Sequence, residues 1–340
     1  MVNTSEVVGK SECARIISEM IRPESASGKM LYRDQDEILS MLESGHSTFI
    51  RDGAGMPVSF CGFYEFDQYI EVGSTITNPE FRGRGLATEC LYRVLDAIQC
   101  SGKEIVAFCN DGSAGLFAKA GFSERPKAEM PDEALAFCAD CAESQTFPGC
   151  HCRYMVFGHR VVQGRGVWHT IIEDPAGGQL KKVAELYCQV WAEPPWDEYD
   201  WDLAEVETEL SEASSDPATA FFVSMVRGEV NGFTIGYPMD KTALAAKAGG
   251  EQLGHLCEDR RQVFYVAELG VAKESRCHGT GIMLSELLSA RARSLGYSRL
   301  ILRTHIKAAP ARALYARLGF VDTGIPDANY PDRTYWVYDE

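Results

Sequence analysis

Residues 265–281, YVAELGVAKESRCHGTG, decide the fold of this chain. They overlap an apolar run, 263–271, whose β-branched and aromatic residues are typical of a buried strand. Two glycines, Gly279 and Gly281, follow, and 282–295 then has the apolar spacing of an amphipathic helix. A strand, a glycine turn and a helix start leave several backbone N–H groups unpaired at the positive end of the helix dipole. This arrangement favours a bound pyrophosphate.

The same pattern occurs a second time, in residues 77–87, TNPEFRGRGLA. Both copies fit Arg-x-x-Gly-x-(Gly or Ala), and each is followed by a helix, a short strand, a second helix and a Gly-Phe pair. A repeat of four elements in the same order indicates two domains of one kind. The residues expected at the phosphates are Arg82, Gly83, Arg84, Gly85, Leu86 and Ala87 in the first copy and Arg276, Cys277, His278, Gly279, Thr280 and Gly281 in the second.

These residues resemble the GCN5-related N-acetyltransferases (GNAT), here as a tandem pair, over most of both halves of the chain. The resemblance implies an α/β fold with two GNAT-type domains, each a splayed, mostly antiparallel sheet flanked by helices. We expect an N-terminal domain in residues 1–160 and a C-terminal domain in residues 161–340, with a glycine-rich linker at 161–166. The N-terminal half is also loosely similar to N-acetylglutamate synthase-like acetyltransferase domains.

Length and composition agree with this division. The 340 residues suit two domains, and a hydrophobic content of 45% is enough for two cores. The formal net charge of −16 argues against binding to nucleic acid or to anionic membranes. It favours a cationic substrate or, alternatively, is only a solvated surface. We see neither a signal-peptide layout nor an apolar run that could span a bilayer, so we expect a cytoplasmic protein.

The twelve cysteines are expected to be mostly free, buried thiols in a reducing compartment. Cys138 with Cys141, and Cys150 with Cys152, have spacings that can close a tetrahedral zinc site. The alternative is a set of packed or free cysteines, because the spacing is less regular than that of a zinc ribbon. A structural zinc ion is therefore one of two interpretations of this segment.

The family resemblance implies acetyl-CoA as the co-substrate and assigns roles to single residues. Tyr315 lies four residues before Gly319 and matches the family tyrosine that reaches the sulfur of coenzyme A, so it is the expected general acid. Glu268, on the strand before the loop, is expected to be the general base or else to recognise the amine. A backbone N–H near Val271 is expected to stabilise the carbonyl oxygen as it gains charge.

The first domain lacks the phenol, because Phe117 occupies the tyrosine position and a phenyl ring cannot protonate a thiolate. Asn110 and Glu71 stand where they could still bind cofactor or substrate. In the second domain, Ala308 replaces an asparagine that many relatives have. We therefore expect the C-terminal domain to catalyse, and the N-terminal domain to bind coenzyme A or support the acceptor pocket without catalysing.

Residues 192–213 combine aromatic and acidic side chains after a helix that Pro194 and Pro195 end. In the GNAT layout this connection lies over the acceptor site. Trp196 and Tyr199, among several carboxylates, would suit a cationic amine through charge pairing and cation–π contact. The alternative is a solvated helix face whose tryptophans pack into the core.

The sequence thus predicts an acetyl-CoA-dependent N-acetyltransferase that transfers an acetyl group by direct attack in a ternary complex. The expected acceptor is a primary amine on a small molecule, such as a cationic metabolite or antibiotic. Two alternatives are left open: an acyltransferase that acts on a peptide or protein amine, and a non-catalytic scaffold that binds coenzyme A.

Overall fold

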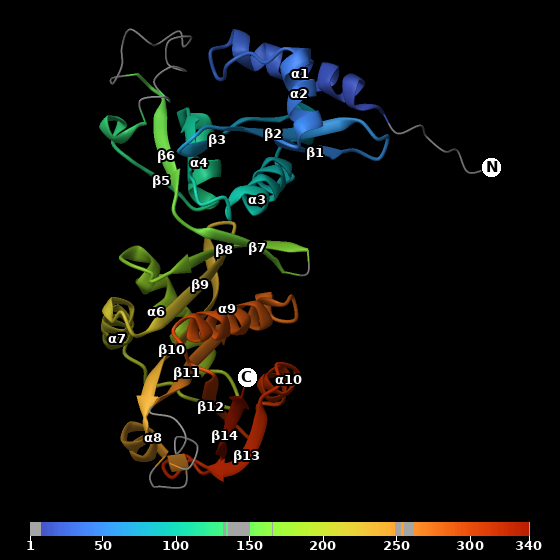
Figure 1. Cartoon of the computed structure of the whole chain (residues 1–340). Helices are drawn as coiled ribbons and strands as arrows, with labels where there is room; N and C mark the ends of the chain where they lie inside the picture. Colours follow the sequence, from blue (N-terminus) through green and yellow to red (C-terminus); the bar gives the residue numbers. More distant parts are fainter. Residues whose placement is uncertain are drawn as a thin grey trace, which may run out of the picture. The chain divides into compact units, whose positions relative to one another are not determined.

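Figure 1 shows the computed structural model of the chain, which describes residues 8–131, 134, 150–164, 166–248, 253–254 and 262–339. The chain divides into two compact units, Met1–Val162 and Gln163–Glu340. The first unit is built on a six-stranded sheet and the second on an eight-stranded sheet, and each sheet is flanked by helices. The predicted fold class, two mixed α/β domains with mostly antiparallel sheets, is confirmed.

In the first unit the strand order is β1-β2-β3-β4-β6-β5. β3 and β4 pair in parallel, and the other pairs described are antiparallel. Helices α1 and α2 cover one face of the sheet and α3 packs on the other (Figure 1). The elements are α1 (Lys10–Ala26), α2 (Gln35–Ser44), β1 (Ser47–Arg51), β2 (Pro57–Glu65), β3 (Tyr69–Thr77), α3 (Leu86–Ile98), β4 (Glu104–Cys109), α4 (Asp111–Lys119), β5 (Phe122–Glu124) and β6 (Arg153–Phe157).

The core of the first unit explains why its first two helices form. Ile17 of α1 and Ile38 of α2 are fully buried against Phe60 of β2, which matches the apolar stripe of each helix. α2 begins with a capping box: Asp34 accepts a hydrogen bond from the Glu37 N–H, and the Glu37 side chain accepts one from the Asp34 N–H. The helices are thus fixed both by their buried faces and by a local N-terminal signal.

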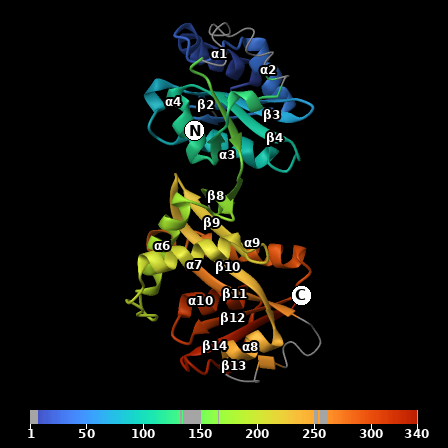
Figure 2. The same ribbon diagram turned by 90° about the vertical axis from the view of Figure 1, so that its left-hand side faces the viewer.

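In the second unit the strand order is β13-β14-β12-β11-β10-β9-β8-β7, with β11 and β12 parallel. Helices α6 and α7 lie on one face of the sheet and α9 on the other (Figure 2). The elements are β7 (Arg160–Gly164), β8 (Val167–Glu173), α6 (Gly178–Trp191), α7 (Leu203–Ser215), β9 (Ala220–Val226), β10 (Glu229–Asp240), α8 (Lys241–Ala248), β11 (Gln262–Val271), α9 (Thr280–Ser294), β12 (Arg299–His305), α10 (Ala309–Arg317), β13 (Val321–Pro326) and β14 (Arg333–Asp339).

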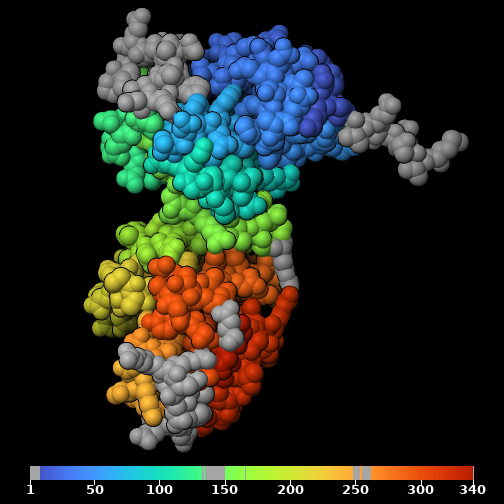
Figure 3. Space-filling view, in the orientation of Figure 1, coloured from blue at the N-terminus to red at the C-terminus, as the bar shows by residue number. Residues whose placement is uncertain are grey.

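The alternation of side chains on β10 explains the two faces. Phe233 is fully buried in the core beneath α6. The preceding residue, Gly232, lies under α9, where a Cβ atom would come within 3.0 Å of Leu284 and Thr280. The glycine therefore lets the start of α9 approach the sheet closely. The outer side of α9 forms part of the surface of this unit (Figure 3).

Two strands of the second unit were not predicted from the sequence. Residues 161–164 of the predicted linker 161–166 form most of β7, because Val161 is fully buried and Gly164 leaves room for the ring of His169; the boundary between the two units falls within this stretch. β13 was not predicted, since none of its residues is buried and it includes Gly324 and Pro326, which are rare inside strands. The glycines at 164 and 166 indicated a turn, but the neighbouring valines favour a strand, and the strand is what forms.

Candidate functional site

The loop after β11 has the geometry of an anion site. Gly279, the N-cap of α9, has a φ of 92°, a left-handed conformation that favours glycine. The first hydrogen bond of the helix runs from the Met283 N–H to the Gly279 carbonyl at 3.0 Å. The N–H groups of Thr280, Gly281 and Ile282 therefore have no acceptor inside the helix, and they lie at its positive end. This helix start suits the predicted diphosphate.

The loop after β3 repeats this geometry in the first unit. Gly83 and Gly85 have φ values of 77° and 79°, and the first bond of α3 runs from the Glu89 N–H to the Gly85 carbonyl at 3.0 Å. A Cβ atom built on either glycine would meet no described atom within 4 Å, so the space in front of the backbone is open. Leu86 and Ala87 are the first two residues of α3. A diphosphate fits this loop on the same grounds.

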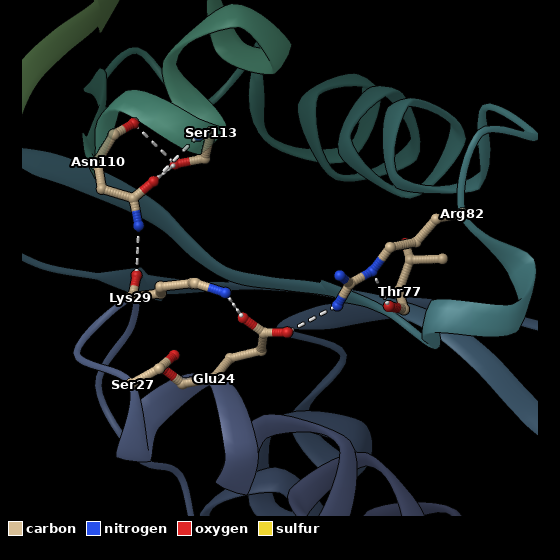
Figure 4. A network of polar contacts seen from close by, with 7 residues as sticks. All are labelled: Glu24, Ser27, Lys29, Thr77, Arg82, Asn110 and Ser113. Carbon is tan, nitrogen blue, oxygen red and sulfur yellow. Dashed lines mark hydrogen bonds and ion pairs between the residues drawn. The ribbon is translucent and has the colours of Figure 1, made fainter.

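Arg82, predicted at the phosphates, makes its described contacts with the protein itself. Its Nε donates to the Thr77 carbonyl at 3.1 Å, and its Nη2 donates to Glu24 Oε1 at 2.8 Å (Figure 4). Glu24, in the last turn of α1, also pairs with Lys29 Nζ at 2.9 Å. Arg82 thus ties the end of β3 to the end of α1, and we call this contact the arginine brace.

Arg276 makes the same brace in the second unit. Its Nε donates to the Val271 carbonyl at 3.0 Å, and its Nη1 donates to Glu193 at 2.5 Å, just beyond the end of α6. Because each guanidinium group is held by two protein contacts, the backbone N–H groups are the better candidates for the anion. A phosphate contact by Arg82 or Arg276 stays a prediction.

Asn110 is also engaged by its own chain. Its Nδ2 donates to the Lys29 carbonyl at 2.6 Å, and its Oδ1 accepts from the Ser113 N–H at 3.1 Å as the N-cap of α4 (Figure 4). Ala308 holds the N-cap position of α10 in the second unit, without a side-chain bond. The amide nitrogen of Asn110 has two N–H donors, so a cofactor contact by this nitrogen would use the donor that does not bind the Lys29 carbonyl.

The other predicted loop residues lie at the surface of the two loops. Arg84 Nη2 donates to the Glu80 carbonyl at 3.3 Å, and its guanidinium group lies 4.9 Å from the centre of the Phe81 ring. Cys277, with a φ of 65°, and His278 are exposed. Binding of a diphosphate here would therefore rest on the backbone, with these side chains at its flanks.

Glu268 lies where the central sheet of the second unit opens. The parallel pairing of β11 and β12 ends at Val266 and Leu302. A β-bulge follows in β11, and Glu268 then stands opposite Ile235 of β10. Since Ile235 belongs to the core beneath α6, Glu268 is on the α6 side of the sheet, beside the predicted splay.

The surroundings of Glu268 favour its protonated form. The carboxyl group is half-buried, and it forms no hydrogen bond with any residue that the structure describes. Burial raises its pKa to about 8, although the positive charges of Lys247, Arg303 and Arg333 act in the opposite direction. The charge of Glu198 adds to the rise. A carboxylate with such a pKa is well matched to take a proton from an amine near neutral pH.

Tyr315 lies within electrostatic reach of Glu268. It is 8% exposed on α10, and its ring meets Phe320 edge-on with the centroids 5.8 Å apart. Burial, followed by the charge of Glu268, raises the pKa of Tyr315, which keeps the phenol protonated as a general acid must be. Phe117 holds the matching place in the first unit, buried on α4 with its ring edge-on to Phe122 at 5.2 Å.

The first unit has a buried carboxylate at a different position. Glu71 is 9% exposed and stands in the last parallel pair between β3 and β4, opposite Val106. Its Oε2 has no hydrogen-bond partner among the described residues. Burial raises its pKa to about 7, against the charge of Arg33, which lowers it. Glu71 lies 11 residues before the brace arginine and Glu268 only 8, so the two carboxylates are not equivalent.

Replacing Glu71 with glutamine should stabilise the protein above pH 7. The folded-state pKa of about 7 exceeds the ordinary value of 4.5, so the folded state keeps a proton that the unfolded state has lost. The contribution of Glu71 to stability is therefore highest below about pH 4.5 and falls as the pH rises through 7, by roughly 3 kcal/mol at most. Urea unfolding at pH 5 and pH 8 measures it, with the exposed Glu80→Gln as control. An equal pH dependence in wild type and Glu71→Gln would refute this assignment.

The acidic and aromatic segment, residues 192–213, contacts an arginine of the same chain. Arg333 donates to Glu198, and its guanidinium group lies 5.2 Å from the centre of the Trp196 ring. Asp202 is used as the N-cap of α7, and Tyr199 is exposed. The segment therefore holds Arg333 in place, and its predicted contact with a ligand amine stays a prediction.

The predicted zinc ligands are only partly visible. Cys138 and Cys141 lie outside the described residues. Cys150 is free, with its Sγ 3.0 Å from Lys127 Nζ, and Cys152 is partly buried. Within the described ranges, no group of three or more His, Cys, Asp or Glu side chains is arranged to hold a metal ion. Structural zinc stays a prediction.

Sequence reasoning missed the cationic side of the candidate site. Arg303 had a visible signal, because it is the one charged residue in the apolar run 300–304. Lys247 lies in a polar, alanine-rich stretch, where a lysine carries no signal of a site. Glu24 and Glu193 of the braces had no signal, since each is far along the chain from the arginine that it contacts.

Both halves of the chain match the acetyltransferase (GNAT) family, over residues 15–122 and 181–320. The two matches together span more than half of the chain. The chain therefore belongs to the acetyltransferase (GNAT) family, with two such regions in tandem. No curated protein sequence matches it. None of the helices in the described ranges is both long and apolar enough to cross a membrane.

Solved structures of this family also match the chain. A mosquito arylalkylamine N-acetyltransferase like 5b has 13% identity and a TM-score of 0.38, with 50% of this chain and 100% of that one covered. A GNAT-family acetyltransferase from Streptococcus pneumoniae has 16% identity and a TM-score of 0.37, with 50% and 99% covered. The N-acetylglutamate synthase of Neisseria gonorrhoeae, in complex with coenzyme A and N-acetyl-glutamate, has 16% identity and a TM-score of 0.35, with 42% and 32% covered.

Proposed function

We propose that this chain is an acetyl-CoA-dependent N-acetyltransferase whose second unit acts on a primary amine of a small molecule. The observation that carries the proposal is the presence in one unit of an unpaired helix start, Glu268 at the opening of the sheet, and Tyr315 within its electrostatic reach. Membership of an acetyltransferase family supports the class of reaction. Acetyl-CoA would supply the activated acetyl group as a thioester.

Each part of the site has one task in this mechanism. The backbone N–H groups of 280–282 hold the diphosphate, and an N–H near Val271 stabilises the carbonyl oxygen as charge develops on it. Glu268 takes a proton from the amine so that its lone pair is free to attack, and Tyr315 gives a proton to the departing thiolate. Holding the two reactants side by side supplies much of the remaining rate.

For the first unit we propose a coenzyme A-binding role without catalysis. The open backbone at Gly83 and Gly85 supports binding, and Phe117 at the tyrosine position argues against catalysis. A scaffold that binds coenzyme A in both units is the alternative for the whole chain, and a peptide amine is the alternative acceptor. A panel of acyl-CoA donors against free amines and peptides separates these readings by whether, and on what, turnover occurs.

Replacing Tyr315 with phenylalanine should lower kcat by on the order of 10²-fold, the usual contribution of a positioned general acid. The ring and its contact with Phe320 are kept, so the core should be unchanged. The measurement is thiol release from acetyl-CoA with the best amine of the panel, between pH 6 and pH 10. Tyr297→Phe, at a partly exposed tyrosine of the same unit, is the matched control. Turnover that does not change in Tyr315→Phe at any pH would remove Tyr315 from its assigned role.

A further inference from the structure

Lys247 of α8 brings a positive charge to the face of the sheet that carries Glu268. Its Nζ lies 4.9 Å from the centre of the Tyr265 ring. Tyr265 is three residues before Glu268 on β11, and the bulge between them puts both on one face. No described carboxylate forms an ion pair with the Lys247 ammonium group, which is half-buried, and burial lowers its pKa. A charge in this position is costly without a partner.

Arg303 adds a second cation at the opening. It stands on β12 directly after Leu302, where the pairing with β11 ends. Its Nη1 donates to Asp327 at 2.6 Å, and Asp327 is fully buried and also accepts from the Tyr335 hydroxyl at 2.5 Å. Asp327 is the one carboxylate in the described part of the chain that pairs with Arg303, whose guanidinium group also lies 5.0 Å from the centre of the Tyr330 ring. A guanidinium group has five N–H donors, so donors remain for a ligand.

The charges of the candidate site do not balance. Arg333 is paired with Glu198, and Arg303 is paired with Asp327. Lys247 forms no ion pair with a described carboxylate, and the nearby charge of Glu268 is lost when Glu268 takes the amine proton, which leaves Lys247 without a counter-ion among the described residues. A ligand that brings a negative charge would complete the set.

We propose that the acceptor is an amine that also carries a carboxylate, and that Lys247, with the unused donors of Arg303, binds this carboxylate while Glu268 faces the amine. The inference rests on the proposed function and narrows its substrate class to aminocarboxylates such as amino acids. The reaction forms the amide N–C bond and breaks the C–S bond of the thioester. The amine proton goes to Glu268, and the thiolate receives a proton from Tyr315. A cationic acceptor would instead bring no negative charge to balance Lys247 once Glu268 has taken the amine proton.

Amines matched in length test the inference on the full chain. One series is 4-aminobutyrate, butylamine and putrescine, and a second is β-alanine, propylamine and 1,3-diaminopropane. A third compares alanine and glutamate with alaninamide and glutamine. We expect kcat/KM for the carboxylated member to exceed that of the others by about 10- to 100-fold in at least one series, the usual worth of a charge-assisted hydrogen bond.

Two variants of Lys247 test whether this residue causes the preference for the carboxylated amine. Lys247→Met should remove most of the preference for the carboxylated amine through KM, by about 10-fold or more. The loss of the Lys247 charge also acts on Glu268, and that effect should be the same for all three classes of amine. Lys247→Glu should turn the preference toward the diamine, because the sign of the charge is reversed. Lys181→Met, at an exposed lysine on α6, is the matched control and should change neither preference. Thermal unfolding of each variant shows whether the fold is kept.

The outcomes separate this inference from the proposed function. If neutral amines or diamines are preferred in every series, or if Lys247→Met slows all three classes equally, the inference is overturned while acetyl transfer stands. If acetyl-CoA binds but no carboxylated amine is acetylated, the inference also falls. If acetyl-CoA gives no heat in calorimetry and no amine is acetylated, the proposed function itself has failed.

Discussion

Replacing Glu268 with glutamine is expected to lower kcat/KM for acetylation by about 10²- to 10⁴-fold, the range of a positioned general base. The carboxyl group must be ionised to accept the amine proton, and its pKa is about 8. In wild type, kcat/KM should therefore rise with pH to a plateau above 8. Glutamine has no titrating proton, so this part of the rise should disappear in the variant. Measured pH profiles of both proteins test the expectation.

The control for Glu268→Gln comes from the other unit. Glu71→Gln removes a second carboxylate that is also enclosed and also has a raised pKa, but in the unit proposed not to catalyse. It should leave the pH profile of the reaction unchanged. A profile that keeps its rise near pH 8 in Glu268→Gln, or loses it in Glu71→Gln, would contradict the assignment of the base.

Replacing Gly279 with aspartate is expected to abolish acetylation, whereas Gly85→Asp should leave it intact. Both glycines are helix N-caps with left-handed backbone, at φ values of 92° and 79°. Aspartate strains this conformation and sets a negative charge against the diphosphate. Together these effects should weaken acetyl-CoA binding at the altered loop by about 10²-fold or more.

Calorimetry with acetyl-CoA, run beside the turnover assay, shows which loop serves which purpose. Wild type should bind one acetyl-CoA in each unit. Each aspartate variant should bind one acetyl-CoA fewer than wild type. Only Gly279→Asp should also lose turnover. If Gly85→Asp silences the reaction while Gly279→Asp does not, the catalytic role belongs to the first unit. Unfolding midpoints close to that of wild type exclude a general loss of structure.

Much of the fold could be predicted from the sequence because the strongest signals are local. The apolar run of β11, the glycine turn and the apolar stripe of α9 lie within 35 residues, and their copy in the first half confirms the pattern. The strand before the second loop and the helix after it were predicted within a few residues of their observed ends. Val161 and Gly164 were read wrongly, because glycines are common in linkers and a sheet edge has no distinct pattern of its own.

The candidate site was harder to predict, because its charges come from distant segments. Tyr315 was predicted from its place four residues before Gly319, and Glu268 from its place on the strand before the loop. The structure puts the two within electrostatic reach of each other. Lys247, Arg303 and Arg333 meet near Glu268 only after the sheet has formed. The acidic composition favours a cationic ligand, yet two acids of this region, Asp327 and Glu198, are already paired with Arg303 and Arg333.

The arginine brace has a consequence for both halves of the chain. Arg82 and Arg276 make the same pair of contacts, although the units differ in the tyrosine position and in the place of the buried carboxylate. The contact is therefore present whether or not the unit has the groups for acetyl transfer. It fixes the backbone where the strand ends, and a unit that only binds a ligand needs that backbone as much as a unit that catalyses.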